Sequence, residues 1–197
     1  MQAARRPNET RSRETRQALL DAARALFVEL GYAETSTPMI VKRAGTTRGA
    51  LYHHYRDKKA IFRAVLEREA ERVAEAITAS EAEVGSQSPL ESLLRGADAY
   101  LEAMQIDGRT RLLLVDGPAV LGALETAEIE GRHARGSLEL GLEELTADTT
   151  IPRPNLAALA ELLSAMFDRA ALAVAEGAPV EHYRDAIHRI LSGLAGD

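Results

Sequence analysis

Residues 35–59, TSTPMIVKRAGTTRGALYHHYRDKK, restrict the fold of this chain more than any other segment, because they contain two helix starts separated by a glycine turn. Ser36 is the expected N-cap of the first helix, with its hydroxyl accepting a first-turn amide, and Pro38 falls within that turn, where a missing N–H costs nothing. This helix is expected to end near Ala44. Gly45 then provides a position where positive φ is inexpensive, so the chain can turn sharply and start a second helix.

Two short helices joined in this way are typical of a helix-turn-helix unit, whose second helix enters the major groove of DNA. The second helix is expected to start at Thr46 or Thr47 and to turn Leu51 inward. Four residues near its start and on its outer side are then expected to meet the groove: Arg48, Gly49, Tyr52 and His53.

The charge of the chain is divided unevenly along the sequence, which supports the same interpretation. The whole chain is acidic, with 24 Lys and Arg against 30 Asp and Glu. Residues 1–72 nevertheless hold 15 basic and 9 acidic side chains, a net charge of +6, whereas residues 73–197 hold 9 basic and 21 acidic side chains, a net charge of −12. A duplex attracts the basic part through counterion release, and the acidic part cannot serve as a second phosphate-binding face.

A family pattern runs through this basic part. The helix expected over residues 12–31 carries one half of it: Ala22-Ala23, Leu26-Phe27 and Leu30-Gly31-Tyr32. The helix-turn-helix segment carries the other half: Ile40, Ala44-Gly45, Gly49, Leu51-Tyr52, His54-Tyr55 and Lys58. Through these motifs, residues 12–66 resemble the TetR/AcrR family of bacterial transcriptional regulators. Val41, Thr46 and Tyr55 replace the family's usual Ala, Val and Phe, and each is expected to change the packing beneath the turn only slightly.

The resemblance implies a sequence-specific DNA-binding regulator, more often a repressor than an activator, that a small-molecule effector releases from its operator. It implies that nine residues lie at or near the double-stranded DNA: Ser36, Thr37, Thr47, Arg48, Gly49, Tyr52, His53, His54 and Lys58. Ser36 and Thr37 would meet phosphates at a helix N-terminus. Residues 1–56 would form a three-helix DNA-binding domain with a basic N-terminal tail, and residues 57–197 a helical domain for ligand binding and dimerisation, joined to it by a long helix.

The chain is expected to be all-α. Leu, Ala, Glu and Arg dominate its 197 residues, and no sustained alternation of apolar and polar residues indicates a strand. Beyond the helix-turn-helix, helices are expected over residues 57–83, 89–106, 126–147, 155–176 and 180–194. Short helices are expected between residues 109 and 125, because Gly117-Pro118 interrupts any longer one.

Composition excludes several other classes of protein. A chain with no Cys has no disulfides, thiolate nucleophiles or Cys-type zinc sites. It also has no uninterrupted apolar tract of about 18 residues that could span a membrane, and residues 1–13 lack the apolar core of a signal peptide. We therefore expect a cytoplasmic protein that does not contact membranes, and we expect neither a metal nor a cofactor.

The two last helices carry a second functional pattern. The final helix has an apolar stripe at helical spacing: Val180, Tyr183, Ile187, Ile190, Leu191 and Leu194. The helix before it is apolar on nearly all sides, and its large side chains include Leu163, Phe167 and Val174. One subunit offers few neighbours for such a helix, so we expect two copies of this hairpin to pair into a four-helix bundle, giving a homodimer. An ordinary monomeric core is the alternative.

Candidates for an effector site lie in the middle of the second half. An apolar cavity with a few polar groups could be lined by Tyr100, Met104, Asp116, His133, Met166 and Phe167, together with segment 112–121. Core packing is the simpler explanation for each of these residues.

Two other classes of protein are alternatives to a site-specific regulator. A helical metal enzyme could use the pairs Glu130/His133 and Asp185/His188, whose spacing is that of metal ligands on one helix face. The charged surroundings of Glu130 predict a solvated face instead, so we expect no enzyme. A protein that binds DNA without choosing sequence would need basic residues spread over its surface, and here they are concentrated beside the motif.

Overall fold

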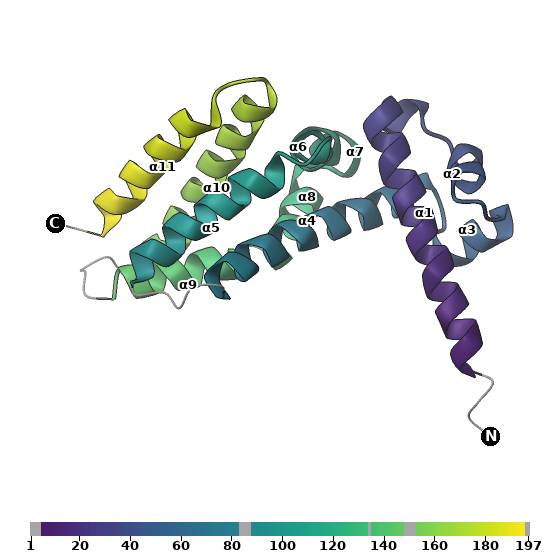
Figure 1. The fold of residues 1–197 in the computed structure, drawn as a ribbon, viewed down its shortest axis with the longest axis horizontal. Coiled ribbons are helices and arrows are strands. Elements are labelled where there is room, and N and C mark those ends of the chain that lie inside the picture. The colour runs from purple at the N-terminus through teal and green to yellow at the C-terminus, as the bar shows by residue number, and fades with distance from the viewer. Residues whose placement is uncertain (1–4, 83–87, 134, 148–152, 196–197) are drawn as a thin grey trace.

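A computed structural model describes residues 5–82, 88–133, 135–147 and 153–195, and this part of the chain is helical, with no strand (Figure 1). The all-α expectation is therefore confirmed. The first four helices are α1 (Arg5–Glu34), α2 (Thr37–Arg43), α3 (Arg48–His54) and α4 (Lys58–Ala82). They are followed by α5 (Pro89–Met104), α6 (Arg109–Arg111), the π-helix η1 (Leu112–Asp116), α7 (Gly117–Leu121), α8 (Ala123–His133), α9 (Arg135–Leu145), α10 (Arg153–Ala175) and α11 (Val180–Leu194).

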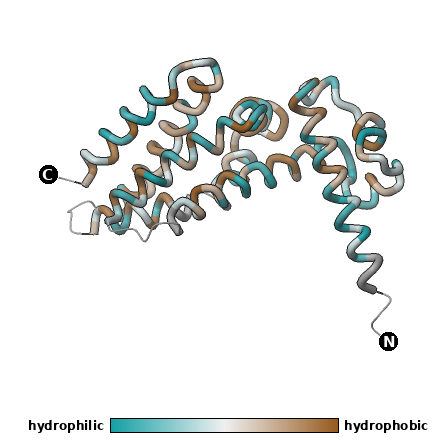
Figure 2. Tube along the Cα trace, in the orientation of Figure 1, coloured by the Kyte–Doolittle hydropathy of each residue, from teal (hydrophilic) through white to brown (hydrophobic). Residues whose placement is uncertain are grey.

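Helices α1, α2 and α3 form a small unit against the first turns of α4 (Figure 1). Its centre is an aromatic cluster, in which the ring of Phe62 lies 5.0 Å from those of both Phe27 and Tyr32. Figure 2 shows hydrophobic positions gathered where α1 crosses α4. Gly31, the expected helix stop, interrupts α1 with φ 79°. Leu30, an apolar residue of the helix expected over residues 12–31, is 43% exposed, although Val28 and Tyr32 on either side of it pack against the core.

Helix α4 joins this unit to the rest of the molecule. Its 25 residues span about 37 Å at 1.5 Å per residue, and it packs most extensively on α5, with further contacts to α1 and α8. One buried cluster is continuous from α1 through α4 to η1, α7 and α8, and a second lies among α5, α9, α10 and α11. The connection between the two ends is therefore a packed interior and not a free linker.

A carboxylate at the middle of α4 ties three helices together. Glu69 has no exposed surface. Its oxygens form an ion pair with Arg24 of α1 at 3.0 Å and accept from Arg72 of α4 at 3.1 Å and Arg109 of α6 at 2.9 Å. Burial alone would raise the pKa of Glu69, but hydrogen bonds from Arg24 and Arg109 outweigh it, so the pKa lies below its ordinary value. The carboxylate is thus ionised and paired at neutral pH.

A second tie connects α6 directly to the end of α1. The guanidinium of Arg111 donates to the backbone carbonyls of Phe27 at 2.6 Å and Val28 at 3.2 Å. Gly108, just before α6, has φ 72°, and a Cβ atom built there would lie 2.5 Å from the Val28 side chain. Glycine is required at this position by both the backbone and the close approach.

The second half of the chain differs from expectation in two ways: in the helices that cover residues 126–147, and in what covers the apolar stripe of α11. Where a single helix was expected over residues 126–147, the structure has two: α8, which ends at His133, and α9, which begins at Arg135. The apolar stripe of α11 is turned towards its own subunit: Ile187 is 2% exposed and Leu191 is fully buried, and both belong to the cluster that includes α5. Leu163 and Phe167 of α10 are buried in the same cluster.

Four residues assigned to a dimer interface, Leu163, Phe167, Ile187 and Leu191, therefore pack inside the subunit, and that part of the expectation is wrong. Large apolar side chains that stay exposed on these two helices are Leu162, 70% exposed, and Ile190, 46% exposed. In the described part of the chain, no helix has the length and apolar character needed to cross a bilayer.

Candidate nucleic-acid interface and internal cavity

The turn between α2 and α3 is built as the glycine predicts. Gly45 has φ 61°, and the amide of Thr46 donates to the Val41 carbonyl at 3.1 Å, which closes the turn. Thr47 is the N-cap of α3, because its hydroxyl accepts from the Ala50 amide at 3.1 Å. Ser36 occupies the N-cap position of α2, but its side chain accepts no capping hydrogen bond, so the capping role expected of its hydroxyl is wrong.

Side chains of α3 divide into an inner and an outer face. Leu51 is fully buried against Ile40 and the first helix, whereas the outer face is exposed in the isolated chain. The exposed residues are those expected at DNA: Thr47, Arg48, Gly49, Tyr52 and His53. A Cβ atom at Gly49 would meet only the Thr47 hydroxyl, at 3.9 Å, so packing within the chain does not require glycine there. A bare backbone at this point leaves room for close approach of another molecule.

A polar contact fixes the outer face of α3 to the start of α2. The hydroxyls of Thr37 and Tyr52 lie 3.4 Å apart. Hydrogen bonds with Thr37 and Arg48 lower the pKa of the Tyr52 phenol. Thr37, Arg48 and Tyr52 therefore form one polar group on the surface of the helix-turn-helix.

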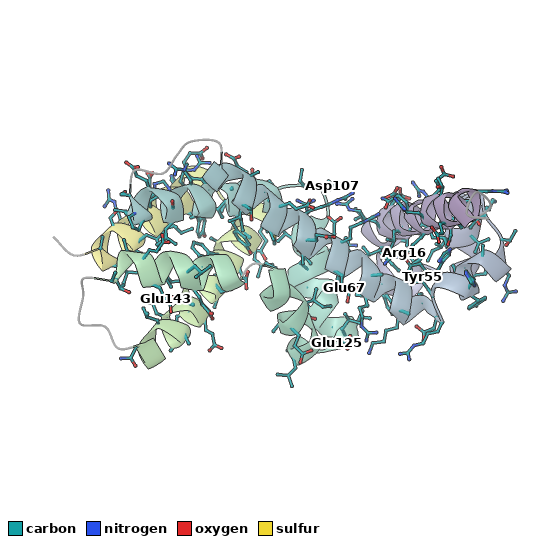
Figure 3. The ribbon with its side chains drawn as sticks, turned by 90° about the horizontal axis from the view of Figure 1, so that it is seen from below. Arg16, Tyr55, Glu67, Asp107, Glu125 and Glu143 are labelled. Atoms are coloured by element: carbon teal, nitrogen blue, oxygen red, sulfur yellow. The ribbon has the colours of Figure 1, made fainter. Side chains whose placement is uncertain are left out.

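The two adjacent histidines differ in environment. His53 is exposed, whereas His54 is partly buried near Tyr55, which with Arg16 lies at the same end of the molecule in Figure 3. Burial lowers the pKa of His54, and the positive charges of His53 and Arg16 lower it further. The imidazole of His54 is therefore neutral at pH 7.

Lys58 has a structural position that the sequence did not reveal. Its ammonium donates to the carbonyls of Tyr32 at 2.8 Å and Ala33 at 3.2 Å, and it lies 4.3 Å from the centre of the Tyr32 ring. These contacts satisfy carbonyls at the end of α1 and hold the start of α4 against it. Most donors of Lys58 are thus used inside the chain, and its place at or near DNA, which the family resemblance implies, stays a prediction.

A cavity of about 300 Å³, partly open to solvent, lies between α4, α5, α8 and α10. Most of its lining is apolar, including Val73 and Ile77 of α4 and Leu113 of η1. Among the expected effector-site residues, Tyr100, Met104 and Phe167 line it. Asp116 does not, since it pairs with Arg111 at 3.2 Å, and Met166 packs in the core beside the cavity without lining it. The side chain of His133 lies outside the described residues.

The cavity also contains acidic groups that sequence reasoning missed. Asp168 of α10 accepts from the Tyr100 hydroxyl at 2.6 Å. Glu130 of α8 lines the same space, and its Oε1 is shielded from solvent without a hydrogen-bond partner among the described residues. Burial, with the nearby charge of Asp168 adding to it, raises the pKa of Glu130 to about 7. The solvated face expected for Glu130 is therefore wrong, because the side of α8 that carries Glu130, with the buried Thr126 and Ile129, is turned into the protein.

The second pair considered as metal ligands, Asp185 and His188, lies on α11. His188 lies 3.0 Å from Asp98 of α5, which also accepts from Arg184 at 3.0 Å, so this histidine belongs to an ion-pair group between α11 and α5. In the ranges that the structure describes, no three His, Cys, Asp or Glu side chains group closely enough to hold a metal ion.

Comparison with known proteins gives the same outline over nearly the whole chain. Residues 19–65 match the bacterial regulatory proteins, tetR family, and residues 90–195 match the tetracyclin repressor-like, C-terminal domain. Over 109 residues the chain is 35% identical to the HTH-type transcriptional regulator AcrR of Shigella flexneri, a match that spans 55% of this chain and 50% of that regulator. Over 155 residues it is 26% identical to the Transposon Tn10 TetC protein of Escherichia coli, spanning 79% and 77% of the two chains.

A solved structure supports the assignment at the level of the fold. The crystal structure of a TetR-family transcriptional regulator from Pectobacterium atrosepticum is 31% identical and superposes with a TM-score of 0.69 over 94% of both chains. The C-terminal family match alone covers more than half of the 197 residues. With the helix-turn-helix, the continuous core and the internal cavity in place, these matches establish that the chain belongs to the tetR family of bacterial transcriptional regulators.

Proposed function

We propose that this protein is a homodimeric repressor that binds a specific operator through α3 and leaves it when a small molecule fills the cavity. Residues 1–56 would be the DNA-binding unit, and residues 57–197 the unit for ligand binding and dimerisation. The observation that carries this function is the outer face of α3, where exposed Arg48 and Tyr52 flank a glycine that packing does not require. Selection of bound duplexes from a random pool is the test: one enriched palindromic site is expected, and no enrichment would contradict sequence-specific binding.

Dimerisation is supported by the outward faces of α10 and α11. Leu162 and Ile190 are exposed beside small residues such as Ala158, Ala165 and Ala186, which permit close approach of a facing helix. A two-fold pairing of these helices would make a four-helix bundle. Two α3 helices placed about 34–36 Å apart would then meet successive major grooves on one side of the duplex.

Release from DNA is supported by the short path between the cavity and α1. Leu113 of η1 lines the cavity, and η1 continues directly from α6, whose Arg109 and Arg111 bind Glu69 and the α1 carbonyls. A ligand that displaces η1 therefore acts on a helix already bonded to the DNA-binding unit. Such a ligand needs different affinities for the two arrangements of that unit, because only a differential affinity shifts the equilibrium.

Arg48→Ala is expected to relax specificity at one base pair, with a cost of about 1–3 kcal/mol if the guanidinium contacts a guanine edge. Binding to a panel of single-base operator variants measures this. An unchanged ranking of those variants would instead assign Arg48 to a phosphate.

Lys58→Ala is expected to lower the stability of the chain by about 1–2 kcal/mol, because carbonyls at the end of α1 lose a charged hydrogen-bond donor. Urea unfolding measures the loss, and Lys59→Ala is the neighbouring control. If Lys58→Ala leaves stability unchanged but reduces the slope of log K against log salt by about 1, the residue serves a DNA phosphate after all.

A further inference from the structure

The charges around the cavity are of one sign. Three carboxylates line it, Glu130 of α8 with Glu161 and Asp168 of α10. No Lys, Arg or His is among the described residues that line it. Glu161 is exposed, but Glu130 and Asp168 are partly buried. Because a carboxylate held out of water without a positive partner is costly, these two are balanced most readily by a cation that enters with the ligand.

The polar groups at the acidic end of the cavity are mainly acceptors, although the hydroxyls of Ser92 and Ser164 also line the cavity. The Tyr100 hydroxyl uses its proton on Asp168, so its oxygen is left to accept. Glu130 Oε1 has no donor among the described residues. The acidic end of the cavity therefore offers acceptors, and a ligand that brings N–H groups satisfies them.

The remaining walls suit the apolar body of the same molecule. The rings of Tyr100 and Phe167 lie 5.8 Å apart at the cavity, and aromatic faces attract cations. Leu93, Leu113 and Leu138 provide an apolar lining. A volume of about 300 Å³ is at the small end of the roughly 300–1,000 Å³ range of ligand sites, which favours a compact molecule.

We propose, building on the function proposed above, that the effector is a small amphiphilic amine, whose positive nitrogen pairs with Glu130 and whose apolar body fills the space between α4, α5 and α10. Anions such as carboxylic acids are disfavoured by the same charges. Glu130 is thus a specificity-determining residue for the sign of the ligand's charge, and Asp168 with Tyr100 positions the nitrogen beside it.

Three probes with one skeleton test the charge preference: phenylbutylamine, phenylbutanol and phenylbutyrate. Titration calorimetry on the full chain is expected to give at least tenfold tighter binding of the amine than of the alcohol, with the carboxylate weakest. Glu130→Gln, which keeps the shape of the side chain, should bring the amine to the affinity of the alcohol. Glu143→Gln, at an exposed position on α9 that does not line the cavity (labelled in Figure 3), should leave the preference unchanged. Asp168→Asn is a second cavity variant and should weaken amine binding in the same direction.

Proton linkage provides an independent readout. Groups that face Glu130 are Tyr100 from α5 with Asp168 and Glu161 from α10, and the described lining residues of α4, η1 and α9 are apolar. Because the pKa of Glu130 is raised to about 7, its carboxyl is mostly protonated at pH 6 and mostly ionised at pH 8. Amine binding should therefore be about tenfold weaker at pH 6 than at pH 8 and should release a proton at the lower pH. The alcohol should show neither effect.

The outcomes separate this assignment from the proposed function. The assignment is overturned if the alcohol or the carboxylate binds as tightly as the amine, if Glu130→Gln keeps the preference, or if the amine does not bind at millimolar concentration. Operator binding without any ligand is measured on the same sample. If the chain prefers the amine but selects no duplex, the cation assignment stands and the proposed function is wrong. If it selects a duplex but shows no preference for the amine, the proposed function stands and the cation assignment is wrong.

Discussion

Leu162→Glu is expected to give a monomer whose operator affinity is lower by about 10²–10⁴-fold. Leu162 is 70% exposed on α10, so the subunit tolerates a carboxylate there, but a two-fold interface would bury two of them without partners. Separated DNA-binding units lose the effective concentration that makes two weak half-site contacts act as one strong contact. Sedimentation and duplex binding, measured on the same sample, check both parts of the prediction.

Two further variants sharpen that experiment. Ile190→Glu tests the facing helix, and Leu124→Glu, 84% exposed on α8, is a matched control that should stay dimeric with unaltered affinity. A dimer that survives both Leu162→Glu and Ile190→Glu would move the interface away from α10 and α11. Ile187→Glu would not serve this purpose, because its carboxylate would lie inside the subunit and unfold it.

Glu69→Ala is expected to destabilise the chain by about 3–5 kcal/mol, the range for removing one partner of a buried ion pair. Arg109, 7% exposed, would then keep its charge without a carboxylate, and α6 would lose its bond to α4. Urea unfolding measures the effect. Glu71→Ala on the exposed side of the same helix is the control and should change stability by no more than about 0.5 kcal/mol. Equal losses in the two variants would show that the pairing contributes nothing.

The same residue gives a pH dependence with a definite sign. The pKa of Glu69 is lowered in the folded chain, so its contribution is present above its unfolded value of 4.5 and is lost as pH falls through the folded pKa. Unfolding curves between pH 6 and pH 3 should therefore fall less steeply for Glu69→Gln than for the natural chain. A Glu69→Gln curve parallel to that of the natural chain would contradict this assignment.

Local features of this molecule were predictable from sequence, and long-range partners were not. Gly45 and Thr47 determine the turn and the start of α3 through their own backbone and hydroxyl, so neighbouring residues suffice to predict them. The stripe on α11 correctly indicates a buried face, but periodicity does not say whether α5 or a second copy covers it. The distinction depends on residues far along the chain that only the folded structure brings together.

Charged residues illustrate the same limit. Glu69 pairs with Arg24 and Arg109, which lie 45 and 40 residues away, and nothing in its local sequence distinguishes it from its solvated neighbours. Glu130 lies in a stretch rich in charge that reads as a surface, although one side of that helix faces the cavity. The role of Lys58 inside the chain could not be read from the sequence, because its carbonyl partners lie at the end of a helix that finished 24 residues earlier.

The glycine before α6 has a consequence for how mutations distribute through such a protein. Any side chain at position 108 would collide with Val28 and would also be strained at φ 72°, so it would force α6 away from α1. The cavity and α3 would both stay intact, since neither includes this position. Genetic screens for variants that bind operator and inducer normally, yet do not leave the operator when inducer binds, should therefore recover substitutions at position 108, where α6 meets α1 and which belongs to neither binding site.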